Sequence, residues 1–162
     1  MPNQARIIVI SDTHGRFRPL YEIVLKHMDE ASCFIHLGDG MNEIEDIHAL
    51  YPDLALYSVP GNCDFGAQGP FMKSVDVSGK TVLFTHGHYH QVKYGLYDLK
   101  QIARSQHANI LLYGHTHQSM AEYDDGLYIM NPGSPVQPRD SKAGYGIIDI
   151  TEAGIVLNLV QI

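Results

Sequence analysis

The chain has 162 residues, and 44% of them are apolar, which is enough for one domain with a substantial core. Its 18 acidic and 11 basic residues give a formal net charge of -7, the wrong sign for a protein that binds long nucleic acid through its phosphates. The sequence has no export signal and no apolar run near the roughly 18 residues of a membrane-spanning helix, so we expect a cytoplasmic protein without membrane contact.

Five apolar runs each end in a polar side chain of a type that binds metals. Residues 7–10 are four consecutive apolar residues, which is typical of a strand buried on both faces, and Asp12 and His14 follow directly. The other four runs behave alike: 34–37 precedes Asp39, 54–59 precedes Asn62, 82–84 precedes His86, and 110–113 precedes His115 and His117. Because α/β proteins place their chemistry beyond the carboxyl ends of strands, we expect these seven side chains to share one edge.

Two helices are predicted between the first three strands. Apolar positions recur every 3.6 residues over 20–31, and a second helix follows Asn42, its expected N-cap, with Glu45 three residues later as the partner in a capping box. Pro52 ends this second helix. The order β-α-β-α-β predicts a parallel sheet with right-handed crossovers.

The second half of the chain has a different pattern. Residues 65–70 contain two Gly and one Pro without periodicity and are expected to form a loop near the candidate residues, where it could cover a substrate. A third helix is expected over 96–106. Hairpins are predicted at Ser78-Gly79, at Asp125-Gly126 and at 152–154. We therefore predict one α/β domain over residues 1–162, with two packed sheets and helices outside, and no internal repeat or linker.

The seven candidate side chains indicate a catalytic metal site. Carboxylate, amide and imidazole donors suit Mn, Fe, Co, Ni or Zn, whereas a structural zinc site would use more Cys. Seven ligands are too many for one ion, so two divalent ions roughly 3.5 to 4 Å apart are expected to share one carboxylate. Asp39 is the candidate for that bridge, because Asp12 is already paired locally with His14.

The order of these motifs resembles the calcineurin-like metallophosphoesterases. The residues that carry the resemblance are Asp12-Thr13-His14, Gly38-Asp39, Gly61-Asn62-Cys63-Asp64, His86 and Gly114-His115-Thr116-His117. Asn131-Pro132-Gly133-Ser134 and Gly144-Tyr145-Gly146 are also similar to the small bacterial and archaeal phosphodiesterase branch, which is related to a retromer subunit that uses this fold as a protein-binding scaffold. The resemblance covers nearly the whole chain.

The resemblance implies a four-layer α-β-β-α sandwich, in which two mixed sheets are flanked by helices. It implies that one metal is held by Asp12, His14, Asp39 and His117, and the other by Asp39, Asn62, His86 and His115. We expect manganese, with nickel, iron, cobalt or zinc as alternatives. A hydroxide that bridges the two metals would attack phosphorus in line, so no protein nucleophile is needed.

One position departs from the family pattern. Most members carry a His directly after the Asn, where it donates a proton to the leaving group, but this chain has Cys63. A thiol with a pKa of about 8.5 is a poor proton donor in that role. We therefore expect esters with acidic leaving groups, such as aryl phosphodiesters, to be cleaved better than alkyl ones. The candidate catalytic residues are Asp39, Asn62, Cys63 and His88, the last as a partial substitute for the missing acid.

Two other functions compete with a phosphodiesterase of small esters. The first is a protein-binding scaffold of the retromer type, and the one feature that favours it is Cys63 in place of the usual His. The second, a phosphomonoesterase, is a lesser alternative. Each motif taken alone is more often a turn or a helix cap, and only their conjunction at five strand ends favours a metal site. The expected partner is a small phosphate ester, with no long nucleic acid and no membrane, and the oligomeric state stays open.

Overall fold

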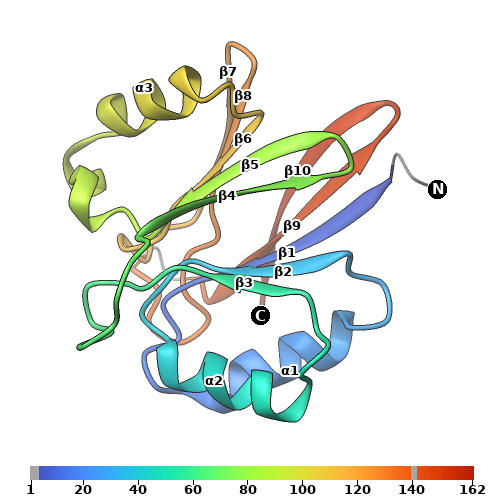
Figure 1. The fold of residues 1–162 in the computed structure, drawn as a ribbon, viewed down its shortest axis with the longest axis vertical. Helices are drawn as coiled ribbons and strands as arrows, with labels where there is room; N and C mark the ends of the chain where they lie inside the picture. The colour runs from blue at the N-terminus through green and yellow to red at the C-terminus, as the bar shows by residue number, and fades with distance from the viewer. Residues whose placement is uncertain (1–3, 140–141) are drawn as a thin grey trace.

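The computed structural model describes residues 4–139 and 142–162, which contain two five-stranded sheets and three α-helices (Figure 1). Sheet A has the order β10-β9-β1-β2-β3 and sheet B the order β4-β5-β6-β8-β7. The strands of sheet A are β1 (Ala5–Ile10), β2 (Cys33–His36), β3 (Leu56–Ser58), β9 (Gly144–Thr151) and β10 (Gly154–Gln161). Those of sheet B are β4 (Met72–Val77), β5 (Lys80–Thr85), β6 (Ile110–Leu112), β7 (Met120–Asp124) and β8 (Leu127–Asn131).

Both sheets are mixed. In sheet A, β1, β2 and β3 are parallel, while β9 runs antiparallel to both β1 and β10. In sheet B, β5, β6 and β8 are parallel, and β4 and β7 are antiparallel edge strands. The predicted order of parallel β-α units first and antiparallel hairpins later is confirmed, as are the turns at Ser78-Gly79, at Asp125-Gly126 and at residues 152–153.

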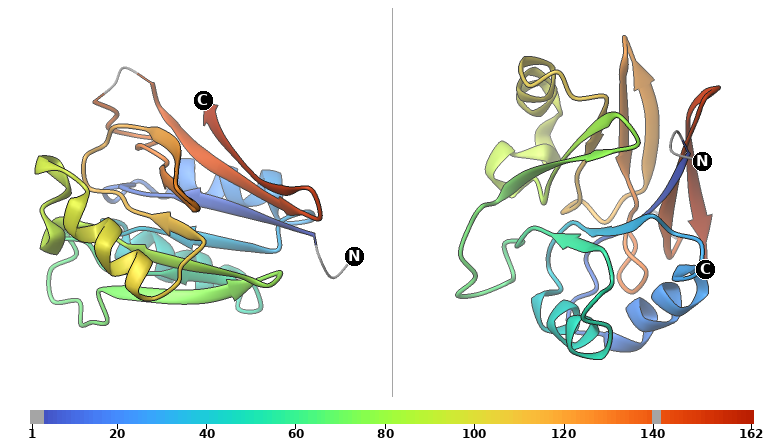
Figure 2. Two further views of the ribbon diagram at one scale, coloured as in Figure 1. Left: turned by 90° about the horizontal axis from the view of Figure 1, so that it is seen from above. Right: turned by 45° about the vertical axis from the view of Figure 1, so that its right-hand side comes forward.

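The α-helices cover the outer faces of the two sheets. They are α1 (Phe17–His27), α2 (Met41–Leu50) and α3 (Tyr97–Ser105), and two short 3-10 turns, η1 (His88–His90) and η2 (Val92–Tyr94), precede α3. Figure 2 shows α1 and α2 against sheet A and α3 on the far side of sheet B. The α-β-β-α sandwich is therefore confirmed.

The alternation of side chains along β1 explains why its apolar run is continuous. Ile7 and Val9 enter the core between the two sheets, whereas Ile8 and Ile10 pack against α1 and α2. Since both faces of this strand are covered, polar residues have no place in it until the strand ends. The first polar residues past β1 therefore lie at the rim of the sandwich.

The start of α2 differs from the prediction. The helix begins at Met41 with Gly40 as its N-cap, and Asn42 and Glu45 make no capping contact. The carboxylate of Asp64 accepts hydrogen bonds from the backbone N–H groups of Gly40 and Met41, at 3.0 Å each. Asp64 lies in a distant loop and binds the free N–H groups at the start of the helix, which allows the helix to begin before Asn42. The predicted capping box is therefore wrong.

Other element boundaries shift by smaller amounts. The first helix ends at His27, four residues before the end of the apolar period, and a turn follows in which the N–H groups of Glu30 and Ala31 donate to the His27 carbonyl. The third strand spans three residues in place of the six predicted. Both cysteines, Cys33 and Cys63, are free as expected. No helix within residues 4–139 and 142–162 has the length and apolarity needed to cross a bilayer.

Candidate metal centre

The seven side chains singled out by sequence meet at one rim of the sandwich, where they form two groups. The first group surrounds Oδ1 of Asp12: Nε2 of His117 lies 3.2 Å from this oxygen and Nε2 of His14 lies 3.6 Å from it. The same His14 nitrogen is 3.7 Å from Oδ2 of Asp39. These atoms are close enough to share one ion.

The second group surrounds His86 and Asn62. Nε2 of His86 lies 3.3 Å from Oδ2 of Asp39 and 3.0 Å from Oδ1 of Asn62. Nδ1 of His115 is 3.1 Å from the same Asn62 oxygen and 3.2 Å from Nε2 of His86. Oδ2 of Asp39 therefore borders both groups, as a shared carboxylate would.

The hydrogen bonding of these groups fits bound cations. Oδ1 of Asp12 is buried and has no hydrogen-bond partner among the described residues. The Nε2 atoms of His14 and His117 face each other at 3.1 Å, although two ring nitrogens have no reason to meet without a proton or an ion between them. A buried acceptor without a donor needs an explanation, and a cation provides one.

Two of the imidazoles are oriented by hydrogen bonds between their Nδ1 atoms and backbone carbonyl groups. Nδ1 of His86 lies 2.7 Å from the carbonyl oxygen of Leu37, and Nδ1 of His117 lies 2.8 Å from that of Gln137. Because a carbonyl only accepts, these contacts place the ring proton on Nδ1 and leave the Nε2 lone pair directed at the centre. This is the usual arrangement around metal-binding histidines.

Charge in the centre shifts the pKa values in a consistent way. Burial raises the pKa of Asp12, but the imidazoles of His117 and His14, which face its carboxylate, outweigh this effect and hold the pKa well below its usual range. The Asp12 contact raises the pKa of His14, and Asp39 and Asp12 raise that of His86 against the opposing effect of its burial. Burial, followed by the charge of His86, lowers the pKa of His115 to about 4. The carboxylates therefore stay ionised and attract positive charge.

The backbone at this rim is unusual. Five of the seven candidates adopt a left-handed conformation with positive φ, which is uncommon for residues other than Gly; they are Asp12, His14, Asp39, His115 and His117. Such conformations cost of order 1–3 kcal/mol each and cluster at functional sites. A rim held against this cost indicates that the placement of the side chains matters.

Sequence analysis did not assign several residues that support the centre. Asp64 was noted within a motif without a role, yet its two oxygens accept four backbone N–H groups, including those of Asp39 and Gly61 at 2.8 Å. The ring of His36, at the end of β2, forms a hydrogen bond with the Thr13 hydroxyl at 2.9 Å and accepts one from the N–H of Gly38 at 3.1 Å. These contacts fix the turns that carry Asp12, His14 and Asp39.

The two remaining candidates lie beside the two groups. The donor atoms of Cys63, His14 and Asp39 are within 4.8 Å of one another. Partial burial and the charge of Asp39 raise the pKa of the Cys63 thiol, which makes it a still weaker acid. The ring of His88 is 5.4 Å from that of His86 and 6.1 Å from that of His115. Both side chains can therefore contact a ligand held at the centre.

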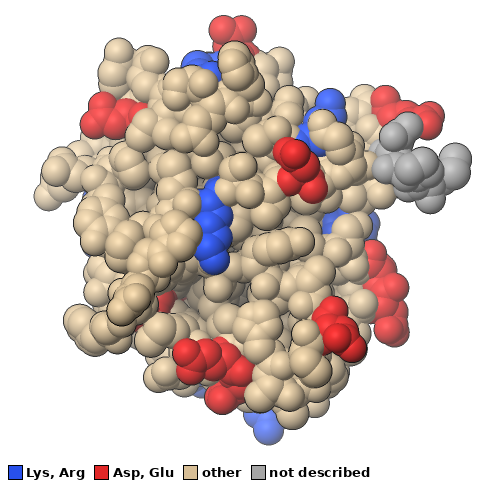
Figure 3. Space-filling model, in the orientation of Figure 1, with Lys and Arg blue, Asp and Glu red and all other residues tan. Residues whose placement is uncertain are grey.

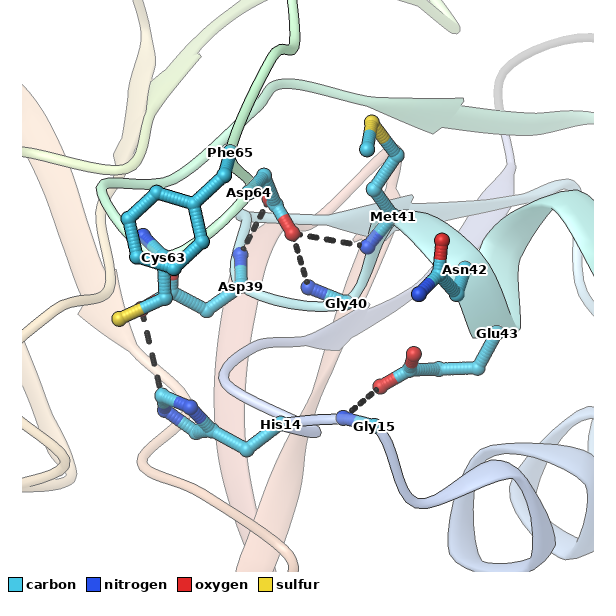
Figure 4. A pocket seen from close by; sticks show the side chains of 10 residues that line it. All are labelled: His14, Gly15, Asp39, Gly40, Met41, Asn42, Glu43, Cys63, Asp64 and Phe65. Atoms are coloured by element: carbon cyan, nitrogen blue, oxygen red, sulfur yellow. Dashed lines mark hydrogen bonds and ion pairs between the residues drawn. The ribbon is translucent and has the colours of Figure 1, made fainter.

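A cavity of about 390 Å³ opens next to the first group. Figure 4 shows its walls, which come from the turn after β1, the start of α2 and the loop after β3. The lining residues are His14, Gly15, Asp39, Gly40, Met41, Asn42, Glu43, Cys63, Asp64 and Phe65. Because two candidate ligands form part of the wall, a molecule bound at the centre can extend into this cavity.

Comparison with known families matches this geometry. A model of the calcineurin-like phosphoesterase superfamily domain matches residues 5–153. The chain therefore belongs to the calcineurin-like phosphoesterase superfamily. Membership implies divalent metals and phosphoester chemistry, and the cluster of buried Asp and His residues is consistent with such a site.

Individual relatives place the chain in the small branch of this superfamily. It is 34% identical over 134 residues to the probable metallophosphoesterase YsnB of Bacillus subtilis, covering 82% of this chain and 76% of that protein. It is 29% identical over 170 residues to the phosphodiesterase YfcE of Escherichia coli K12, covering 89% and 87% respectively.

Solved structures share the fold. A Streptococcus pneumoniae protein described as a predicted phosphoesterase superposes with a TM-score of 0.86 at 27% identity, covering 98% of this chain and 90% of that one. Vacuolar protein sorting 29 of Cryptosporidium parvum superposes with a TM-score of 0.75 at 15% identity, covering 98% of each chain, which shows a common fold.

Proposed function

We propose that this protein is a phosphodiesterase that uses two divalent metal ions to hydrolyse small phosphodiesters. The observation that carries the proposal is the position of Asp39, whose Oδ2 borders both donor groups. When bound, two such ions acidify a water molecule and offset the charge of the phosphoryl oxygens. The ligand sets would be Asp12, His14, Asp39 and His117 for one ion, and Asp39, Asn62, His86 and His115 for the other.

The side chains near the metals would orient the substrate and protonate the leaving group. The amide of Asn62, whose side chain is exposed, and the ring of His115 would orient the phosphoryl group at the rim. Cys63 stands where an acid for the leaving group is expected, but its raised pKa makes it a weak donor. His88 lies farther from the metal centre, with its ring 6.1 Å from that of His115, and would contact the substrate on the same side as His115. Because the proton donor is weak, we expect diesters with acidic leaving groups to be cleaved fastest.

Specificity for diesters and for manganese is part of the proposal. The relative named as a phosphodiesterase, at 29% identity, supports diesters over monoesters. The mixture of carboxylate, amide and imidazole donors suits manganese, with zinc, iron, cobalt and nickel as alternatives.

A small substrate agrees with the surface charge. On the face shown in Figure 3, acidic and basic side chains are interspersed among many uncharged ones, and the described residues there form no broad basic stripe. With a net charge of -7, the molecule lacks the electrostatic surface that long nucleic acid requires. We therefore propose a small ester as the partner, without nucleic acid or membrane.

The test is hydrolysis of bis(p-nitrophenyl) phosphate by protein stripped of metal and reloaded with Mn, Zn, Fe, Co or Ni. We expect turnover that depends on added metal and is fastest with Mn, and slower turnover of p-nitrophenyl phosphate run in parallel. A faster monoester reaction would instead support a phosphomonoesterase. No turnover of either ester with any metal would reject the enzymatic proposal and favour the scaffold function.

A further inference from the structure

The cavity beside the metal centre contains a carboxylate that neither the predicted ligand sets nor the fold explains fully. Glu43 lies in the first turn of α2, is only 2% exposed and lines this cavity. Buried Glu residues are rare unless they are paired. Its role therefore needs an account.

One oxygen of Glu43 has a structural partner and the other does not. Oε2 accepts a hydrogen bond from the N–H of Gly15 at 2.6 Å, next to His14. In the described part of the chain Glu43 makes no other hydrogen bond and no ion pair, and Figure 4 shows Oε1 directed into the cavity. Because this oxygen faces the cavity and has no protein donor, a ligand in the cavity can donate a hydrogen bond to it.

The other charged groups of the cavity are already engaged. Among the described residues, neither Lys nor Arg lines the cavity. Asp64 accepts four backbone N–H groups, and Asp39 belongs to the proposed metal centre. Of the acidic residues described in this lining, Glu43 is therefore the one left to select what enters the cavity.

We propose that this cavity binds one of the two ester groups of the substrate and that Glu43 selects an ester group carrying a hydrogen-bond donor, a hydroxyl or an ammonium. Its negative charge, with no Lys or Arg among the described lining residues to pair with a second anionic group, disfavours such a group. This inference rests on the proposed function, because the phosphate must be held at the metal centre for its ester group to reach the cavity. It narrows the substrate class to phosphodiesters of amino alcohols or polyols.

Dialkyl phosphates test this selection by binding alone, since they lack an acidic leaving group and can bind in either orientation. The dissociation constants of four diesters would be measured by calorimetry with Mn-loaded protein: diethyl phosphate and the ethyl diesters of 2-hydroxyethyl, 2-aminoethyl and carboxymethyl phosphate. We expect the aminoethyl diester to bind about tenfold more tightly than diethyl phosphate, the hydroxyethyl diester about threefold more tightly, and the carboxymethyl diester about tenfold more weakly.

Two variants separate selection from a structural role. Glu43→Gln keeps an oxygen that can accept from Gly15 and removes the charge, so the aminoethyl advantage should fall below about twofold while diethyl phosphate binds as before. Glu45→Gln is the matched control on the exposed side of the same helix and should change none of the four constants.

Equal binding of all four diesters by the unmodified protein would overturn the inference, as would a Glu43→Gln variant that weakens all four alike, because Glu43 would then act only on the Gly15 turn. Turnover of bis(p-nitrophenyl) phosphate, measured on the same preparation, distinguishes the two proposals. Turnover with equal binding rejects the selection by Glu43, whereas selective binding without turnover rejects the phosphodiesterase function.

Discussion

The two sheets contribute different donor atoms to the rim. The turns that follow the strands of sheet A supply the oxygen donors, namely Asp12, Asp39 and Asn62, together with His14. The turns that follow β5 and β6 of sheet B supply only imidazoles, namely His86, His115 and His117. Neither sheet alone holds all the residues of either proposed ligand set, so the candidate metal centre lies between the sheets and depends on how they pack.

The two sheets pack against each other through an apolar core. Its buried side chains, such as Val9, Ile35, Phe84 and Leu112, come from both sheets and exclude water between them. We therefore expect the metal-free protein to stay folded and metals to adjust the rim. Changes at the rim should therefore alter metal binding and activity more than they alter folding.

Removing the shared carboxylate should have the largest effect. Asp39→Asn keeps the size of the side chain but lowers the negative charge that both groups share, so we expect loss of at least one ion and about a thousandfold lower kcat on bis(p-nitrophenyl) phosphate. Metal analysis and steady-state kinetics check this. Asp46→Asn, on the exposed side of α2, is the control and should behave as the unmodified protein. An Asp39→Asn variant with two ions and more than about a tenth of the activity would contradict the bridge.

Removing one ligand from each sheet should have matching effects. His14→Ala and His117→Ala act on the same group from opposite sheets, and each should weaken binding of one ion by about 10- to 100-fold. Metal titration measures both affinities, and His107→Ala at an exposed site serves as the control. If only one of the two ligands mattered, the first group would not span the sheets as described.

Much of this arrangement could be predicted from sequence because it depends on local patterns. A polar residue directly after an apolar run marks the end of a buried strand, and this located Asp12, Asp39 and His86. The support of the centre was not predictable in the same way. Asp64 caps α2 from a loop more than 20 residues away, and Glu43 has the appearance of an ordinary first-turn acid, so both roles exist only in three dimensions.

Replacing Cys63 should change how fast esters with different leaving groups are cleaved more than it changes metal binding. Cys63→His would restore a proton donor, so we expect about tenfold faster cleavage of alkyl phosphodiesters and less than about a twofold change for aryl ones. Kinetics on a series of diesters with different leaving-group pKa values measure this, with Cys63→Ser as the control that should leave both classes unchanged. Rates of the unmodified protein that are independent of leaving-group pKa would show that leaving-group protonation is not limiting.

Metal affinity should depend on pH through the histidines with raised pKa. His14 and His86 hold their protons to a higher pH than usual because carboxylates face them, and a metal must displace those protons. Affinity should therefore fall by about tenfold as the pH falls from about 8 to 6. The pKa of His115 is about 4, so this ring is already neutral and adds nothing in that range. A constant affinity across this range would contradict the assignment.

Thermal stability should change least. Since metals bind the folded rim and the core holds without them, saturating Mn should raise Tm by a few degrees, and EDTA should reverse this without unfolding the protein at room temperature. Scanning calorimetry and circular dichroism measure both. Unfolding on metal removal would mean that the ions, and not the apolar core, hold the sheets together.

Anomalous diffraction from crystals grown with Mn tests the central claim most directly, because it locates the ions relative to each sheet. We predict two ions at the rim, both in contact with Asp39 and each also bound by at least one imidazole from sheet B. A single ion, or ions bound by residues of one sheet alone, would contradict a dinuclear centre built between the sheets.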